Sequence, residues 1–248
     1  MKIKEIDAIS YKNGIWKNVS EKVVLDETVT LTINGEISRS LSAIEDSLRE
    51  FAVGYLFNEN MVKSLDDIYD IKISANQINA EINDELLKTN ETVLCSDSAG
   101  GWRTKIKNVN PVKSDFKVKA EELIRRIEEL KDNALIWQST GGTHVAGIVC
   151  GDEFIVKEDV SRHVAVDKVI GCGILNDFDL GHSYVIYSGR MPADMVIKMT
   201  RAGIPILASN ASPANSGYEI AKKGNITLVG FLRGNRCNIY NNNDRIIF

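Results

Sequence analysis

The sequence predicts a protein of mixed α and β structure, with a small sheet-plus-helix domain followed by a larger α/β domain. Apolar residues alternate along the first forty positions, as in antiparallel strands. The second half instead alternates short apolar runs with segments of helical periodicity. A basic and polar segment containing Pro111, residues 104–115, separates the two patterns. We therefore expect an N-terminal β-rich domain over residues 1–110 and a second domain over residues 111–248.

Composition narrows the class of protein. The 248 residues are 44% hydrophobic and 26% charged, as in an ordinary globular protein with a substantial core. No apolar run is long enough to span a bilayer and the first residues do not resemble a signal peptide, so we expect a cytoplasmic protein without a membrane partner. The net charge of -4 argues against a general nucleic-acid binder. Arginines of the second half could still form a local positive patch.

The N-terminal pattern predicts two hairpins and one helix. Val29–Ile33 alternates, and Asn34-Gly35 then supplies a two-residue turn for a strand returning through Glu36–Leu41. Ser42 and Glu45 have capping-box spacing, and the apolar residues after them recur at helical intervals. A helix over residues 44–58 should therefore cover one face of the sheet. Alternation over residues 71–82 predicts a second hairpin, which leads into a loop containing Cys95.

Cys95 is the candidate nucleophile. It lies in the polar stretch Leu94–Trp102, where small neighbours should leave its sulfur exposed, and an exposed thiol of lowered pKa is reactive. The alternative is structural, because most free cysteines are small buried hydrophobes. The other cysteines, Cys150, Cys172 and Cys237, form no Cys-x-x-Cys pair and show no metal-ligand spacing. We therefore expect reduced thiols and no intrinsic metal.

The second half predicts an α/β sandwich with a largely parallel sheet. Val118–Asn133 is an amphipathic helix whose charged residues should form a solvated face. Strands are then expected at His144–Val149, Glu153–Lys157, Tyr184–Tyr187, Ile204–Ala208, Ile226–Phe231 and Cys237–Tyr240. Helices are expected at His163–Ile174, Pro192–Ala202 and Pro213–Lys223.

Three strand exits carry the residues of a candidate ligand site. Ligands of such folds bind beyond the carboxyl ends of the strands. The exits are Ser188–Arg190, Ser209–Ser212 and Phe231–Arg236. They offer small residues, hydroxyl or amide donors, and arginines that can fork onto phosphate oxygens. The sequence therefore predicts a polyphosphate or dinucleotide site at one edge of the sheet.

Two further segments are candidates for function: one has ionisable residues at the start of a predicted helix, and the other is rich in glycine. Arg162 and His163 stand at the start of a predicted helix, and Asp167 follows His163 by one turn. Asp167 could orient the imidazole or pair with a neighbouring cation, and the spacing does not decide between them. The glycines of Thr140–His144 precede a strand, so they suit a tight turn better than a phosphate loop. A zinc deaminase would need His-x-Glu and Cys-x-x-Cys, which the chain lacks.

Taken together, these motifs resemble the FdhD family of formate dehydrogenase accessory sulfurtransferases. The residues that carry the resemblance are Leu48–Tyr55, Ser139–His144, Glu158–His163 with Asp167-Lys168, Ser188–Arg190, Ala202–Ala208 and Ile226–Arg236. The resemblance implies a cytidine-deaminase-like, three-layer α/β/α second domain without zinc. It implies a protein that takes persulfide sulfur from a cysteine desulfurase. The sulfur passes to a molybdenum or tungsten bis-guanine-dinucleotide cofactor before that cofactor enters formate dehydrogenase.

The resemblance also implies roles for single residues. Cys95 would carry the persulfide, whereas Ser98 stands where the family usually has a second cysteine. The cofactor would contact the last strand exit, whose residues are Phe231, Leu232, Arg233, Gly234, Asn235 and Arg236. Arg162, His163 and Arg190 are candidates for the same pocket. A homodimer is expected on the same ground.

Two alternatives stay open at this point. The missing second cysteine favours a chaperone that delivers the molybdenum cofactor without sulfur chemistry. A nucleotide-modifying enzyme on the deaminase-like fold is disfavoured by the missing metal ligands. Loss of formate dehydrogenase activation in a Cys95→Ala variant would favour the carrier over the chaperone.

Overall fold

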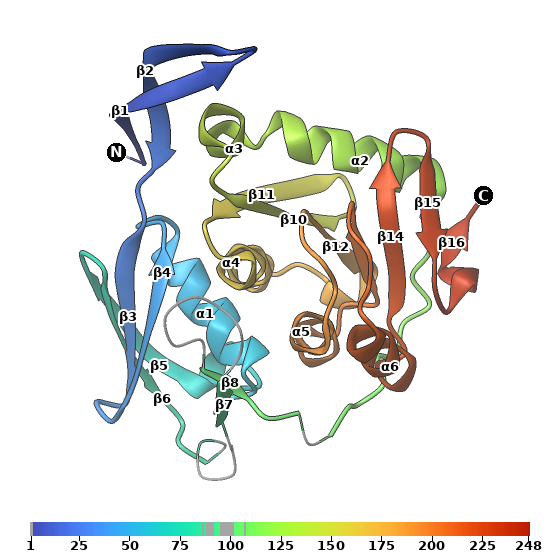
Figure 1. Cartoon of the computed structure of the whole chain (residues 1–248). Coiled ribbons are helices and arrows are strands. Elements are labelled where there is room, and N and C mark those ends of the chain that lie inside the picture. The colour runs from blue at the N-terminus through green and yellow to red at the C-terminus, as the bar shows by residue number, and fades with distance from the viewer. Residues whose placement is uncertain (1, 86, 88–91, 95–101, 107) are drawn as a thin grey trace.

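The computed structural model describes residues 2–85, 87, 92–94, 102–106 and 108–248 (Figure 1). The helices are α1 (Leu48–Asn58), α2 (Ala120–Asp132), α3 (Leu135–Thr140), α4 (Arg162–Leu175), α5 (Ala193–Ala202) and α6 (Asn215–Gly224). The N-terminal strands are β1 (Ile3–Lys12), β2 (Ile15–Val24), β3 (Glu27–Ile33), β4 (Ile37–Ala43), β5 (Ile68–Ser74), β6 (Gln77–Ile82), β7 (Thr92–Leu94) and β8 (Trp102–Thr104). The later strands are β9 (Val118–Lys119), β10 (His144–Cys150), β11 (Glu153–Asp159), β12 (Ser183–Tyr187), β13 (Ile206–Ser209), β14 (Thr227–Arg233), β15 (Arg236–Ile239) and β16 (Ile246–Ile247).

A six-stranded sheet forms the centre of the second half, in the order β11-β10-β12-β13-β14-β15. Only the β12–β13 and β13–β14 pairs are parallel, and the other three pairs are antiparallel. The expectation of a largely parallel sheet was therefore wrong. Short hairpins at both edges cause the difference, because tight turns such as Gly151-Asp152 join only antiparallel strands.

Helices cover both faces of this sheet, which gives three layers (Figure 1). Strand residues alternate between the two faces. Val145 and Ile186 belong to the apolar cluster that includes α2 residues. Ile148 and Tyr187 belong to the cluster that includes α4 and α5 residues. The predicted strands and helices of this half are thus confirmed within a few residues at each end, while the short helix α3 was not anticipated.

The N-terminal part contains a four-stranded sheet, ordered β4-β3-β6-β5, and the helix α1. Asn34 and Gly35 have φ values of 50° and 68°, as a tight turn of the predicted kind requires, but Ile33 pairs with Ile37, so three residues connect the strands instead of two. Helix α1 begins at Leu48, four residues later than predicted, because Ser42 and Ala43 still belong to β4. Its N-cap, Ser47, makes no capping hydrogen bond through its side chain.

Helices α1 and α4 cross with their backbones in contact. A Cβ atom placed on Gly54 of α1 would lie 1.9 Å from the backbone oxygen of Asp167. A Cβ atom placed on Gly171 of α4 would lie 1.9 Å from the backbone oxygen of Glu50. Only glycine permits this approach. One apolar cluster runs through the junction and includes residues from both sides of position 110, such as Phe51 and Val164. The division of the chain at residue 110 stays a prediction.

Two buried ion pairs lie beside this crossing. The Asp167 carboxylate accepts hydrogen bonds from Lys198 of α5 at 2.5 Å and from the amide of Asn58, at the end of α1, at 2.6 Å. Lys168 donates to Asp159 at 2.7 Å and to the backbone oxygen of Ile44 at 3.1 Å. Asp167 therefore pairs with a neighbouring cation, which decides one alternative that the sequence left open.

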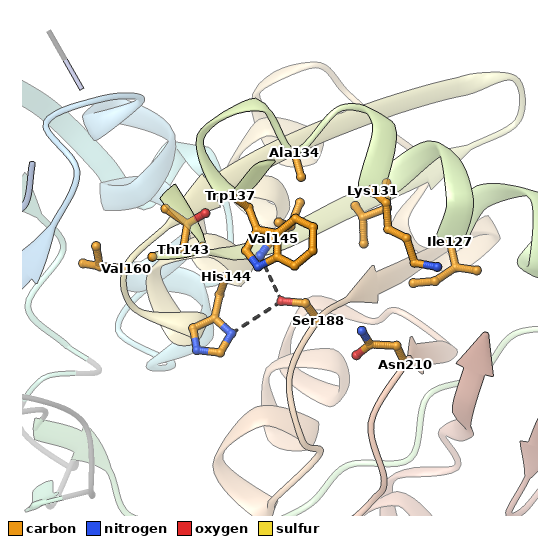
Figure 2. Close-up of a pocket in the computed structure, with 13 residues that line it drawn as sticks. Ile127, Lys131, Ala134, Trp137, Thr143, His144, Val145, Val160, Ser188 and Asn210 are labelled. Atoms are coloured by element: carbon orange, nitrogen blue, oxygen red, sulfur yellow. Dashed lines mark hydrogen bonds between the residues drawn. The ribbon is translucent and has the colours of Figure 1, made fainter. Parts of the chain in front are cut away.

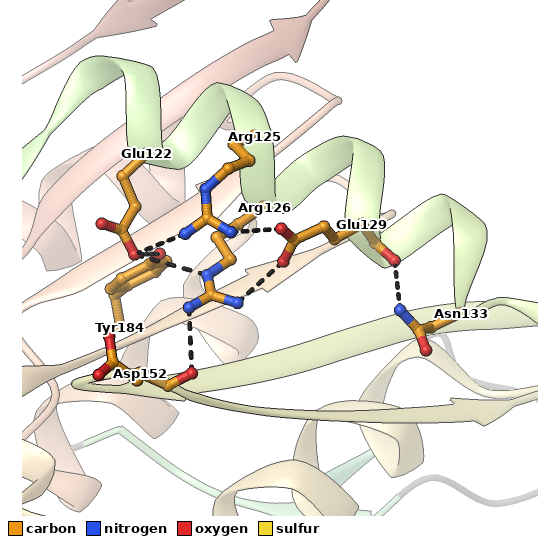
Figure 3. A network of polar contacts seen from close by, with 7 residues as sticks. All are labelled: Glu122, Arg125, Arg126, Glu129, Asn133, Asp152 and Tyr184. Carbon is orange, nitrogen blue, oxygen red and sulfur yellow. Dashed lines mark hydrogen bonds and ion pairs between the residues drawn. The ribbon is translucent and has the colours of Figure 1, made fainter.

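The charged side of α2 is only partly a solvated face (Figure 3). Arg125 and Glu129 are solvent-accessible, but the side chain of Arg126 is only 9% exposed. Arg126 donates to Glu129 at 2.8 Å and to the backbone oxygen of Asp152 at 3.2 Å. Its guanidinium also lies 5.2 Å from the ring centroid of Phe154. Arg126 thus fastens α2 to the β10–β11 hairpin, which the sequence pattern did not reveal.

Strands β1 and β2 form a separate hairpin that projects from the molecule (Figure 1). Several large apolar side chains on it are exposed, with Ile9 at 67% and Trp16 at 69%. Strand β2 packs against α3, where Leu135 is also exposed. Across the described ranges, no helix combines the length and the apolar character needed to cross a bilayer.

Candidate ligand-binding edge

The predicted strand exits meet at one edge of the central sheet. Strands β12, β13 and β14 run parallel, so their carboxyl ends lie side by side. Strand β10 runs in the opposite direction, so its first residue, His144, lies at the same edge. The helices that follow β11, β12 and β13 begin there too. The sequence prediction that the three exits share one edge is thus confirmed by the register of the strands.

Hydrogen bonds to backbone oxygens join the three exit loops. Met191 donates to the backbone oxygen of Ser212 at 3.1 Å, and Ser209 donates through its hydroxyl to the backbone oxygen of Gly189 at 2.6 Å. Phe231 donates to the backbone oxygen of Ala211 at 3.0 Å. Each exit therefore fixes the position of the next, as a preorganised binding surface requires.

The exit at Phe231–Arg236 forms the turn between β14 and β15. Phe231 and Gly234 have φ values of 52° and 54°, and the β14–β15 register shifts at this point. The side chains of Arg233 and Arg236 are exposed, as are Gly234 and Asn235. The Arg233 guanidinium lies 5.9 Å from the ring centroid of Phe231. Leu232 differs, because its side chain is completely buried in the apolar cluster beneath α2 and only its backbone could face a ligand.

Arg162 and His163 begin helix α4, capped by Ser161. The Arg162 side chain lies beside Gly189, in the β12 exit. His163 is completely buried, and its Nε2 atom lies 3.4 Å from a carboxylate oxygen of Asp194 on α5. Burial alone would raise the pKa of Asp194, but the hydrogen bond and charge of His163, with the charges of Arg162 and Lys198, lower it to about 2. Arg162 thus reaches the edge, whereas His163 lies behind it.

Arg190 follows β12 with an exposed side chain. Its backbone oxygen accepts a hydrogen bond from the hydroxyl of Tyr187. Burial raises the pKa of Tyr187 well above the usual value, and the charge of Arg162 opposes that shift. Tyr187 is therefore a neutral hydrogen-bond donor that holds the loop, while the Arg190 guanidinium faces solvent at the edge.

A pocket of about 430 Å³ opens at the same edge (Figure 2). We call it the Trp137 pocket; it is lined by Ile127, Leu130, Lys131, Ala134, Trp137, Gly141, Gly142, Thr143, His144, Val145, Val160, Ser188 and Asn210. Ser188 accepts a hydrogen bond from the backbone of Val145 at 3.0 Å and lies 3.4 Å from Nδ1 of His144. Ser188 and Asn210 each belong to one of the predicted exit loops.

The carboxylate of Glu158 holds α3 at the mouth of the Trp137 pocket. It accepts hydrogen bonds from the backbone of Ile136 at 2.9 Å and of Trp137 at 2.7 Å, and from the hydroxyl of Thr143 at 2.8 Å. These partners belong to the first turn of α3 and to the strand entry after it. The carboxylate thus satisfies backbone donors that a helix start leaves open.

Cys95 and Ser98 lie outside the described residues. The strands on either side, β7 and β8, pair antiparallel with Leu94 opposite Trp102. Sequence reasoning missed Trp137 and the function of Glu158, because α3 has only six residues and no N-cap signal in its own sequence. In the described part of the chain, no three His, Cys, Asp or Glu residues are grouped so as to hold a metal ion.

Comparison with known proteins places this geometry in a family. The FdhD/NarQ family pattern matches residues 24–247. The protein named Sulfur carrier protein FdhD from Methanothermobacter thermautotrophicus is 49% identical over 245 residues, which cover 98% of this chain and 98% of that protein. A protein of the same name from Saccharolobus solfataricus is 30% identical over 99% of each chain.

A solved structure agrees with the fold. The crystal structure of a candidate formate dehydrogenase accessory protein from Desulfotalea psychrophila superposes with a TM-score of 0.82 and 25% identity, covering 100% of both chains. Its fold therefore matches the mixed α and β arrangement described above. The family match and the sequence identities together show that this chain belongs to the FdhD/NarQ family.

Proposed function

We propose that the protein is a sulfur carrier that loads sulfur on Cys95 as a persulfide and delivers it to a bis-guanine-dinucleotide cofactor of molybdenum or tungsten. The names of the relatives support sulfur carriage and a link to formate dehydrogenase. The observation that carries the cofactor part is the edge itself, where the hydrogen-bonded exit loops present Arg190 and the Arg233–Arg236 turn, and Arg162 of α4 lies beside them. Guanidinium groups beside small residues are suited to pyrophosphate oxygens.

The loading step is a thiol–persulfide exchange with a cysteine desulfurase. The Cys95 thiolate attacks the outer sulfur of the donor persulfide, so a new S–S bond forms on Cys95. The S–S bond of the donor breaks and the donor cysteine leaves as a thiolate. Release of the carried sulfur as sulfide consumes two electrons, which a thiol supplies by forming a disulfide with Cys95. Because Ser98 replaces a second cysteine, a partner protein provides that thiol.

Mass spectrometry of the intact protein tests the carrier step. The full chain is incubated with a cysteine desulfurase and cysteine, and we expect one added sulfur atom, located on Cys95. Cys95→Ser should gain none. Cys237→Ser is the matched control, because Cys237 is half-buried and should leave the loading unchanged. A wild-type protein that acquires no sulfur, or acquires it on another cysteine, contradicts the carrier mechanism.

The absence of a second cysteine favours one alternative, a chaperone that binds and delivers the cofactor without sulfur transfer. The carrier and the chaperone can be distinguished by expressing variants in cells that lack the native protein and measuring the activation of formate dehydrogenase. The carrier requires Cys95, so Cys95→Ala should abolish activation, whereas Arg233→Ala/Arg236→Ala should impair both functions. Full activation by Cys95→Ala would favour the chaperone. In either function we expect the protein to work in the cytoplasm, as a homodimer.

A further inference from the structure

We propose that the end of the β1–β2 hairpin docks onto a negatively charged lipid surface, which it binds through aromatic side chains and lysines. We call the segment Ala8–Val19 the hairpin tip. The proposal goes beyond the proposed function, because lipid binding involves neither Cys95 nor the edge of the central sheet. Nearly all of the hairpin precedes residue 24, where the family pattern begins, so the family assignment leaves this surface without a function.

The hairpin tip is narrow, and the hairpin contacts the rest of the molecule near its base. Lys12 pairs with Ile15 across the Asn13-Gly14 turn, whose two residues have φ values of 52° and 83°. At the base, a Cβ atom placed on Gly142 would lie 2.9 Å from the side chain of Val24, so the hairpin packs closely against the turn after α3. A two-stranded hairpin is only marginally stable by itself in water, so a contact partner for the tip would stabilise it.

Large apolar side chains lie on both faces of the hairpin tip. Cross-strand partners share a face, so Tyr11 and Trp16 lie on one face and Ile15 lies on the other. All three side chains are more than half exposed, and the rings of Tyr11 and Trp16 lie 4.6 Å apart. A protein partner packs on one face of such a ribbon, whereas the boundary of a bilayer surrounds an inserted tip on every side. The distribution of apolar groups therefore favours a lipid surface.

The position of these apolar groups suits the headgroup region of a bilayer. Tyr11, Ile15 and Trp16 lie within two residues of the turn, so at about 3.3 Å per residue they are within about 10 Å of the end of the hairpin. Apolar groups that bind at a membrane surface reach about 5–10 Å into it. Tyrosine and tryptophan gather at this boundary, because their rings are apolar at one end and polar at the other. The expectation of a protein without a membrane partner concerned spanning segments, which binding at the surface does not require.

Charge is segregated along the hairpin. Within the hairpin tip the only charged residues are Lys12 and Lys17, and both are exposed. The acidic residues of the hairpin lie nearer to its base: Glu5, Asp7 and Glu21. The end that would enter the headgroup layer is therefore positive, although the whole chain has a net charge of -4. Lysines close to anionic headgroups strengthen binding, so the charge of the tip is complementary to a layer of acidic phospholipids.

Co-sedimentation of the full chain with vesicles tests this proposal. One set of vesicles contains phosphatidylglycerol and phosphatidylcholine in equal parts, and the other contains phosphatidylcholine alone. We expect binding to the first set, weakened by added salt, and much weaker binding to the second. Trp16→Ala should weaken binding to the anionic vesicles about tenfold, and Lys12→Gln/Lys17→Gln should weaken it about thirtyfold. Trp16→Tyr, which keeps an amphipathic ring, should retain most of the affinity.

Matched controls come from other parts of the surface. Tyr69 of β5 is 69% exposed, as Trp16 is, so Tyr69→Ala should leave vesicle binding unchanged. Lys113→Gln/Lys117→Gln removes two exposed charges outside the hairpin and should also leave it unchanged. Control variants that weaken binding as much as the tip variants would show that the tip is not the docking surface.

A wild-type protein that binds neither set of vesicles overturns the proposal. If Trp16→Ala then dissociates a dimer in sedimentation equilibrium, the hairpin tip is an interface between two copies of the chain and not a lipid contact. Vesicle binding needs neither sulfur nor a cofactor, so failure here leaves the proposed function standing. Failure of Cys95 to acquire sulfur would likewise leave the lipid contact standing.

Discussion

Two groups of ionic contacts in this protein join segments that are distant in sequence, but they differ in solvent exposure. Asp167 and Lys198 are at most 1% exposed and connect α4 with α5 and, through Asn58, with α1. His182 joins Asp179 at 2.8 Å and Asp115 at 3.1 Å, with all three side chains more than half exposed. The bonds are of similar length. Their contribution to stability should nevertheless differ greatly, because water competes only for the second group.

Asp167→Ala should have the largest effect. Removal of the carboxylate takes away the counter-charge nearest to the buried ammonium of Lys198, which costs about 3–5 kcal/mol of the free energy of unfolding. Denaturant titration measures the change. Asp70→Ala, which breaks the exposed Asp70–Lys72 pair, is the control and should leave the midpoint unchanged. If the double variant Asp167→Leu/Lys198→Met is as unstable as Asp167→Ala, packing rather than charge explains the loss.

Gly171→Ala tests the packing beside that ion pair. Its methyl group would meet the backbone oxygen of Glu50, so α1 and α4 must separate, at a cost of about 1–3 kcal/mol. Gly181→Ala is the control, because its methyl group would meet only a carboxylate oxygen of the exposed Asp179 side chain, at 3.3 Å. Equal thermal midpoints for the two variants would show that the helix crossing is less rigid than its geometry indicates.

Glu158→Ala should have an intermediate effect on stability, because Glu158 is less buried than Asp167 and less exposed than His182. Glu158 is half-buried, and its loss leaves the backbone donors of Ile136 and Trp137 to water. We expect a cost of about 1–2 kcal/mol, as for the loss of an N-cap. Chemical denaturation measures the cost, and tryptophan fluorescence reports on the environment of Trp137. An unchanged emission spectrum together with unchanged stability would contradict the role assigned to Glu158.

His182→Gln should have the smallest effect, and that effect should depend on pH. Hydrogen bonds to Asp179 and Asp115 raise the pKa of His182 above its usual value of 6.5. The stabilisation is therefore complete below the unfolded-state pKa and is lost as the pH rises through the folded-state pKa. Unfolding measured across this interval should show a slight decline in the wild type that His182→Gln lacks. A steeper decline in the variant would reverse this assignment.

Much of the fold could be predicted from the sequence because its signals are local. Alternation and helical periodicity located nearly every element of the second half, and Asn34-Gly35 identified its turn from residue type alone. The sheet was wrongly expected to be largely parallel, since pattern does not encode strand direction at the edges. The exit loops were predicted because parallel strands place their ends together.

The Trp137 pocket could not be predicted, because it depends on contacts between distant segments. Trp137 lines the pocket from α3, whose first turn is held by Glu158 of the distant strand β11. Likewise, Leu232 and Arg126 are buried because of how α2 lies on the sheet. The residues next to them in the sequence do not distinguish them from exposed residues. Residue type indicated the chemistry at the edge, whereas tertiary contacts decide which side chains reach it.

The glycine contact between α1 and α4 also limits the motions that the two halves of the chain can make. Because no side chain separates the two helices at this contact, they should move as one rigid unit. Helix α4 begins at Arg162, so this residue belongs to that unit. A hinge at this junction would expose the two buried ion pairs beside it and break the hydrogen bonds that Asn58 and Ile44 make to them, so opening of the two halves should be costly. Arg162 should therefore keep its position relative to α1 when a ligand binds at the edge of the central sheet.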